Sequence, residues 1–162
     1  MIELSNGDKI NLELYPDLAP ITVANFVSLA EEGKYDGTIF HRVIEGFMIQ
    51  GGGYDLGFDA VDADNIIGEF SSNGYDNDLS HTRGVISMAR AQDYDSASSQ
   101  FFIMHQDALY LDGEYAAFGR VSDDESLAVV DKIAAVSTGV IEELGLSDVP
   151  VSPVLITTIT IE

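Results

Sequence analysis

The chain has 162 residues, 46% of them hydrophobic, no cysteine, and 28 acidic against 7 basic residues, which gives a formal net charge of -21. This length fits one domain that buries roughly 70% of its unfolded surface, and the absence of cysteine excludes disulfides and thiolate metal sites. So negative a surface repels phosphate backbones and argues against a nucleic-acid partner.

The first residues, MIELSNGDKINLEL, lack the basic and apolar regions of a signal peptide. No run approaches the roughly 18 apolar residues that a membrane helix needs. We therefore expect a cytoplasmic protein with no membrane partner, folded as a single domain over residues 1–162. The acids are spread along the chain, which is compatible with solubility, adaptation to salt or attraction of cationic partners.

Short β-rich runs recur along the chain. KINLEL alternates Ile10, Leu12 and Leu14 with polar neighbours, which is the period of a strand with one buried face. The further runs are TIFHRVI, FMIQ, GVISMA, QFFIM, AAFGRV and VLITTITI. Many short strands predict a mainly β fold, either a closed barrel or a sandwich.

Two segments carry helical patterns instead. APITVANFVSLAEEGKY has Pro20 where a first helical turn tolerates it and Gly33 as a stop signal. SDDESLAVVDKIAAV opens with a capping box of Ser122 and Glu125. Each predicted helix has one apolar stripe, so the two could cover the open ends of a barrel.

Motifs of several common sites are absent. GGGYDLG has neither the spacing nor the helix of a dinucleotide-binding loop, and DAVDADNIIGE lacks the ligand order of a calcium loop. His41, His81 and His105 lie in separate segments, which argues against zinc. There is no G-x-S-x-G elbow, but a Ser-His-Asp triad stays open because its members need not be neighbours in sequence. We expect no metal and no cofactor.

The stretch FHRVIEGFMIQGG places Arg42 inside one apolar run and Gln50 at the end of the next. A two-residue hairpin loop would set Arg42 across from Ile49, whereas a three-residue loop, Glu45 to Phe47, sets it across from Gln50. The second register groups Arg42, Gln50 and Met48 on one face, where the glutamine carbonyl can accept a hydrogen bond from the guanidinium. An edge-strand arginine that reaches water is the alternative, and the hairpin alone leaves both open.

Together with HTRGVISMARA, SSQFFIMHQ and YLDGEYAAFGRV, this hairpin closely resembles the cyclophilin family of peptidyl-prolyl cis-trans isomerases, and its bacterial members in particular. The resemblance extends over nearly the whole chain, with motif order and approximate spacing retained. It implies a closed eight-stranded antiparallel β-barrel capped by two α-helices. It also implies a monomeric enzyme that assists folding by accelerating rotation of X-Pro bonds in proline-containing peptides and in unfolded or partly folded proteins.

The resemblance further implies an active surface. In it, Arg42 is the catalytic arginine and Gln50 the glutamine that orients it. The implied substrate-binding residues comprise an apolar pocket, a backbone ridge and further groove positions: Phe47, Met48, Phe102 and Leu111; Ala89, Arg90 and Ala91; His41, Gln100, Tyr110 and Tyr115. For the apolar residues, ordinary core packing is the alternative interpretation.

Some positions depart from the family pattern. Tyr110 stands where many eukaryotic members carry a tryptophan, Tyr115 where many carry a histidine, and Arg90 where asparagine is common. The first departure predicts only weak binding of the inhibitor cyclosporin. Arg90 should either favour an acidic residue before the X-Pro bond or pair with Asp93 or Asp95.

Two functions of other classes stay open. One is a non-catalytic module that binds proline peptides, and the other is an acidic hydrolase with paired carboxylates, for which no motif marks a pair. Arg42 with Gln50 favours the isomerase, because a pure binder needs no donor aimed at the amide nitrogen.

Overall fold

The computed structural model describes residues 1–162 in eleven β-strands, two α-helices and three short 3-10 helices. The strands are β1 (Ile2–Leu4), β2 (Lys9–Ile10), β3 (Leu12–Leu14), β4 (Arg42–Ile44), β5 (Met48–Gly51), β6 (Val85–Met88), β7 (Phe101–Met104), β8 (Ala117–Val121), β9 (Thr138–Ile141), β10 (Leu146–Pro150) and β11 (Ile156–Ile159). The helices are α1 (Pro20–Glu31), α2 (Asp124–Ala134), η1 (Ser71–Asn73), η2 (Leu109–Leu111) and η3 (Glu142–Leu144). The predicted class, mainly β with two α-helices, is confirmed.

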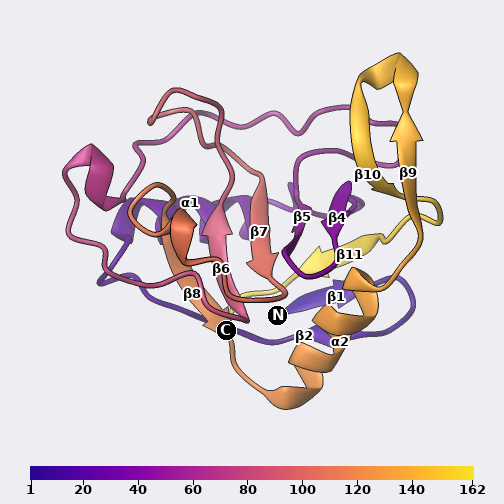
Figure 1. The fold of residues 1–162 in the computed structure, drawn as a ribbon, viewed down its shortest axis with the longest axis horizontal. Coiled ribbons are helices and arrows are strands. Elements are labelled where there is room, and N and C mark those ends of the chain that lie inside the picture. Colours follow the sequence, from indigo (N-terminus) through magenta and orange to yellow (C-terminus); the bar gives the residue numbers. More distant parts are fainter.

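The strands pair in three antiparallel sheets. Six form the order β3-β8-β6-β7-β5-β4, three form β11-β1-β2, and β9 pairs with β10 in a hairpin that projects from one end of the molecule (Figure 1). This differs from the single closed sheet of eight strands that was predicted. Outside the named strands only isolated bridges occur, such as Ile39 with Leu155.

The predicted strand over residues 9–14 is broken at Asn11, so β2 pairs with β1 and β3 with β8 in different sheets. The Asn11 N–H donates to Ser126 Oγ (2.8 Å), and its carbonyl accepts from the Ser122 N–H (3.0 Å). Groups at the start of α2 therefore take the bonds that Asn11 would offer a continuous strand. This break keeps two of the sheets apart.

Side chains alternate between the two faces of the six-stranded sheet, and both faces carry buried apolar residues. The inner face contributes to the main core of 24 buried residues, and the outer face to a cluster of only 7. Val43 and Ile49 belong to the main core, whereas Met48 and Phe102 belong to the outer cluster with Leu111 from η2. The outer cluster therefore lies between the sheet and the segment that carries η2.

Helix α1 begins at Pro20, as predicted, but no side chain at its own N-terminus caps it. The buried Glu69 does so from 47 residues away, since its Oε1 accepts from the N–H (2.6 Å) and the hydroxyl (2.7 Å) of Thr22. A first-turn N–H has no partner within its own helix. One tertiary contact thus completes the helix start and ties it to the loop before η1.

The predicted capping box of α2 is wrong by one residue. Asp123, not Ser122, is the N-cap, and its carboxylate accepts from the Ser126 N–H (2.7 Å). The other carboxylate oxygen accepts from the Asn11 side chain (2.9 Å). Glu125 makes no reciprocal hydrogen bond to the N-cap residue, so the second hydrogen bond of a capping box is absent.

We expect Glu69→Ala to lower the free energy of unfolding by about 1–3 kcal/mol, because a helix donor and a hydroxyl would be left buried without an acceptor. Glu69→Gln keeps one acceptor oxygen and should cost less. Denaturant titration measures both. Glu32→Ala, which removes an exposed carboxylate bonded to Ser28 at the other end of α1, is the control. Equal losses in Glu69→Ala and Glu32→Ala would contradict the capping role.

Candidate active site

The hairpin of β4 and β5 has the three-residue register predicted from sequence. Arg42 lies opposite Gln50, and Ile44 opposite Met48. The loop turns at Gly46, which has a positive φ of 80° that suits glycine. The Gly46 N–H donates to His105 Nδ1 (2.9 Å), so the turn is fixed to the residue that follows β7. Arg42 and Gln50 therefore share the outer face of the sheet.

A cavity of about 140 Å³ opens on this face. It brings together nine of the predicted site residues: Arg42, Phe47, Met48, Gln50, Ala89, Arg90, Phe102, Leu111 and Tyr115. Pockets for drug-sized ligands span roughly 300–1,000 Å³, so this one suits a single small ring. Two arginine side chains, Arg42 and Arg90, thus border a small hollow whose other residues are mostly apolar.

A chain of neutral amides holds Arg42. Gln50 Oε1 accepts from a terminal nitrogen of the guanidinium (3.3 Å), and Gln50 Nε2 donates to Gln100 Oε1 (2.8 Å). No carboxylate oxygen lies within 4.0 Å of the Arg42 guanidinium. The Arg42 side chain is therefore directed without being neutralised, and its remaining N–H donors are open to a ligand.

Arg90 is occupied, but by other partners than the two aspartates suggested by the sequence. Its guanidinium lies 5.0 Å from the Phe70 and Tyr94 ring centroids and 4.8 Å from that of Tyr115. It donates to the carbonyl of Glu114 (3.0 Å), and its acidic neighbour is the Glu114 carboxylate (3.9 Å), not Asp93 or Asp95. With its side chain only 11% exposed, Arg90 braces the Tyr115 wall of the cavity and is poorly placed to select acidic substrates.

Four predicted substrate-binding residues do not line the cavity. His41 is buried outside the cavity lining, and its ring meets that of Tyr54 edge-on at a centroid distance of 4.9 Å. Gln100 acts on the cavity only through Gln50, and Ala91 donates its N–H to Ser96. Tyr110 is 74% exposed, with its ring 6.1 Å from that of Phe47 at the rim.

The Ser-His-Asp arrangement that the sequence left open does exist. His81 Nε2 lies 2.9 Å from Ser87 Oγ, and His81 Nδ1 lies 3.0 Å from Asp112 Oδ1. Ser87 is fully buried in β6, so its hydroxyl is closed to a substrate and the arrangement is no hydrolase site. Sequence reasoning gave these residues no role. The feature of the sequence that could have pointed to this arrangement is Ser87, a polar residue inside an otherwise apolar strand.

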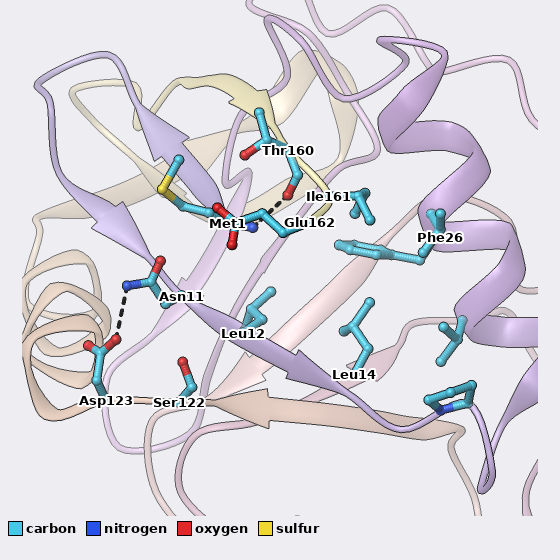
Figure 2. A pocket seen from close by; sticks show the side chains of 13 residues that line it. Met1, Asn11, Leu12, Leu14, Phe26, Ser122, Asp123, Thr160, Ile161 and Glu162 are labelled. Atoms are coloured by element: carbon cyan, nitrogen blue, oxygen red, sulfur yellow. Dashed lines mark hydrogen bonds between the residues drawn. The ribbon is translucent and has the colours of Figure 1, made fainter.

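A larger hollow, of about 630 Å³, lies elsewhere between β3, α1 and the C-terminal residues. Figure 2 shows its apolar side at Leu14 and Phe26 and its polar end at Asn11, which is bonded to Asp123. It shares no residue with the cavity at Arg42, and no arginine or histidine lines it. Size alone therefore does not mark the place where the predicted catalytic residues meet.

Two further observations concern metal ions and membranes. No group of three or more His, Cys, Asp or Glu side chains is arranged to hold a metal ion. Neither helix has the length and apolar character needed to span a bilayer.

The family model described as cyclophilin type peptidyl-prolyl cis-trans isomerase/CLD matches residues 1–161. The chain is 42% identical over 169 aligned residues to a peptidyl-prolyl cis-trans isomerase of Acinetobacter baylyi, which covers 100% of this chain and 85% of the relative. It is 41% identical over 166 residues to peptidyl-prolyl cis-trans isomerase B of Escherichia coli, covering 97% and 96% of the two chains.

Among solved structures, a cyclophilin type peptidyl-prolyl cis-trans isomerase of Cryptosporidium parvum, crystallised in the presence of the dipeptide Ala-Pro, is similar with a TM-score of 0.77. The two sequences are 28% identical, and the match covers 99% of this chain and 96% of that one.

His41 predicts a pH effect on stability. Its Nδ1 is buried without a partner, and burial, then the charge of Arg42, lowers the pKa of His41 from 6.5 to about 4. The unfolded chain therefore binds this proton below about pH 6.5, whereas the folded chain does so only near pH 4. Acidification across this range should cost up to about 3 kcal/mol of stability from this group.

The measurement is the free energy of unfolding of the wild type and of His41→Phe at several pH values from 7 to 4. All other titratable groups are common to the two proteins and cancel in the difference. We expect the wild type to lose stability relative to the variant as pH falls. A difference that is constant with pH would show that His41 is protonated as readily in the folded chain as in the unfolded one.

Proposed function

The chain belongs to the cyclophilin-type peptidyl-prolyl cis-trans isomerases, and we propose that it catalyses with Arg42 on a proline ring held in the cavity beside that side chain. Isomerases of this family bind proline-containing peptides, and the names of the curated relatives support the same enzymatic activity here. A role in protein folding follows from that reaction, because X-Pro isomerisation is slow enough to limit folding.

The reaction is rotation about an X-Pro amide bond. Rotation is slow because it breaks the resonance that gives the C–N bond partial double-bond character. In the planar ground state the proline nitrogen shares its lone pair with the carbonyl and accepts no hydrogen bond. At the twisted transition state the lone pair is localised on nitrogen. A donor aimed at that nitrogen therefore stabilises the transition state selectively, which is what catalysis requires.

The observation that carries the proposal is the Arg42 guanidinium, directed by Gln50 and free of any carboxylate, at the edge of an apolar cavity. We assign its free N–H donors to the proline nitrogen in the transition state. Met48, Phe102, Leu111 and Tyr115 would hold the ring while the preceding carbonyl turns.

The free energy needed for catalysis is larger than one hydrogen bond from Arg42 can supply, so the pocket must contribute. An acceleration of about a millionfold requires roughly 8 kcal/mol. A charge-assisted hydrogen bond contributes about 1.5–3 kcal/mol. We assign the rest to the fixed position of the ring and to the low polarity of the pocket, which favours the less charge-separated twisted amide.

A non-catalytic binding module is not favoured. Such a module has no use for an unneutralised donor held at the proline pocket, and the relatives are named as isomerases. The monomeric state, the cytoplasmic location and weak cyclosporin binding stay predictions. So does closure into an eight-stranded barrel, which bridges such as Ile39 with Leu155 support.

The test is the cis-to-trans rate of a short X-Pro peptide. Arg42→Ala should lower kcat/KM by about tenfold or more, since the lost bond is worth about 1.5–3 kcal/mol. Gln50→Ala should lower it less, because the donor remains but is no longer directed.

Arg120→Ala is the matched control, since it removes the same charge from an exposed position in β8. It should leave kcat/KM unchanged. A folded Arg42→Ala protein with wild-type turnover would refute the assigned role.

A further inference from the structure

The buried His81 is held in one orientation by hydrogen bonds at three points. Asp112 Oδ1 accepts from the His81 backbone N–H (2.7 Å) and lies 3.0 Å from Nδ1, while Ser87 Oγ lies 2.9 Å from Nε2. The other Asp112 oxygen accepts from the Ser80 hydroxyl (2.6 Å). Each polar atom of the imidazole therefore has a partner, although His81 itself is wholly shielded from solvent.

These bonds also fix the tautomer. A carboxylate only accepts hydrogen bonds, so the proton facing Asp112 sits on Nδ1, and Nε2 accepts from the Ser87 hydroxyl. Burial lowers the pKa of His81 despite the opposing effect of Asp112, which keeps the ring neutral. Burial tends to raise the pKa of Asp112, but hydrogen bonds from Ser80 and His81 hold it below the usual value, so its carboxylate stays ionised.

The His81 ring backs the aromatic side of the proline cavity. It stacks on Phe102 at a centroid distance of 5.9 Å and an interplanar angle of 17°, and it meets Tyr115 edge-on at 6.4 Å. Phe102 and Tyr115 contact each other at 5.7 Å in a T-shaped pair, and both line the cavity. Any rotation of the imidazole would therefore be transmitted to both walls.

Asp112 lies at the partly exposed end of this chain of contacts, with its side chain 36% exposed. It directly follows Leu111, another cavity residue, at the end of η2. The same carboxylate thus joins the segment that supplies Leu111 to the segment that supplies His81. Three sides of the cavity depend on it: Leu111 through the chain, and Phe102 and Tyr115 through His81.

We propose that Asp112 is a positioning residue for X-Pro isomerisation, which sets the shape of the proline cavity through His81 and Leu111 without touching the substrate. The inference rests on the proposed function of that cavity. The rotating amide must stay in line with Arg42 while the ring is anchored, and a displacement of about 1 Å can cost up to a hundredfold in rate. A carboxylate outside the cavity therefore contributes to turnover.

The test uses three substitutions and an X-Pro peptide assay, with the folded fraction of each protein measured by denaturant titration. Asp112→Ala removes the acceptor for both His81 N–H groups, and we expect kcat/KM to fall about three- to tenfold. Asp112→Asn keeps an acceptor oxygen and should restore at least about half of the activity.

Asp123→Ala is the matched control. It removes an aspartate that likewise accepts a backbone N–H and a side-chain donor, but at the N-cap of α2, away from the cavity. It should lose stability and keep kcat/KM per folded molecule. If Asp112→Ala shows no loss beyond that of Asp123→Ala, or if Asp112→Asn is as impaired as Asp112→Ala, the positioning role is overturned.

The outcome is separable from that of the proposed function. If Arg42→Ala is impaired while Asp112→Ala is not, only the positioning role fails. If Arg42→Ala keeps wild-type turnover, the proposed catalytic function of the cavity is refuted, and the positioning role of Asp112 falls with it.

Discussion

The site depends on the register of one hairpin. Side chains alternate between the two faces of a strand, so pairing Arg42 with Gln50 places both on the outer face with Met48, while Val43 and Ile49 enter the main core. A slip of one residue would bury the guanidinium and expose two core side chains. The penalty for burying an unpaired charge and the gain from the apolar core therefore select the same register.

Arg42 has no carboxylate partner although the protein is strongly acidic. On a chain with a net charge of -21, carboxylates are plentiful, and Arg83 and Arg90 each lie beside one. Arg42 is bonded instead to the neutral amide of Gln50, which Gln100 holds in turn. The charge of Arg42 therefore stays available for a ligand. The guanidinium of Arg90, in contrast, packs against aromatic rings, including that of Tyr115 in the wall of the cavity.

Features that depend on local sequence patterns could be predicted, whereas contacts between residues far apart in the sequence could not. Alternation predicted the hairpin register, and Pro20 with Gly33 marked both ends of α1. The Glu69 cap and the Asp112–His81 contact join residues far apart in sequence, so no local pattern marks either one. The β9–β10 hairpin was not predicted because its apolar residues do not alternate with polar ones: Val140 and Ile141 are adjacent in β9, and Ser147 and Asp148 are adjacent in β10. The family resemblance supplied the groove, but it placed His41 there, whereas this side chain is buried against Tyr54 and does not line the cavity.

The most direct measurement is the exchange rate between cis and trans forms of a short Ala-Pro peptide, with and without a catalytic amount of the protein. The account predicts that exchange, which takes tens of seconds unaided, becomes many times faster in proportion to the protein added. Binding of the peptide with no change in its exchange rate would contradict the account, since it would make the cavity a proline-binding site and leave Arg42 without a catalytic role.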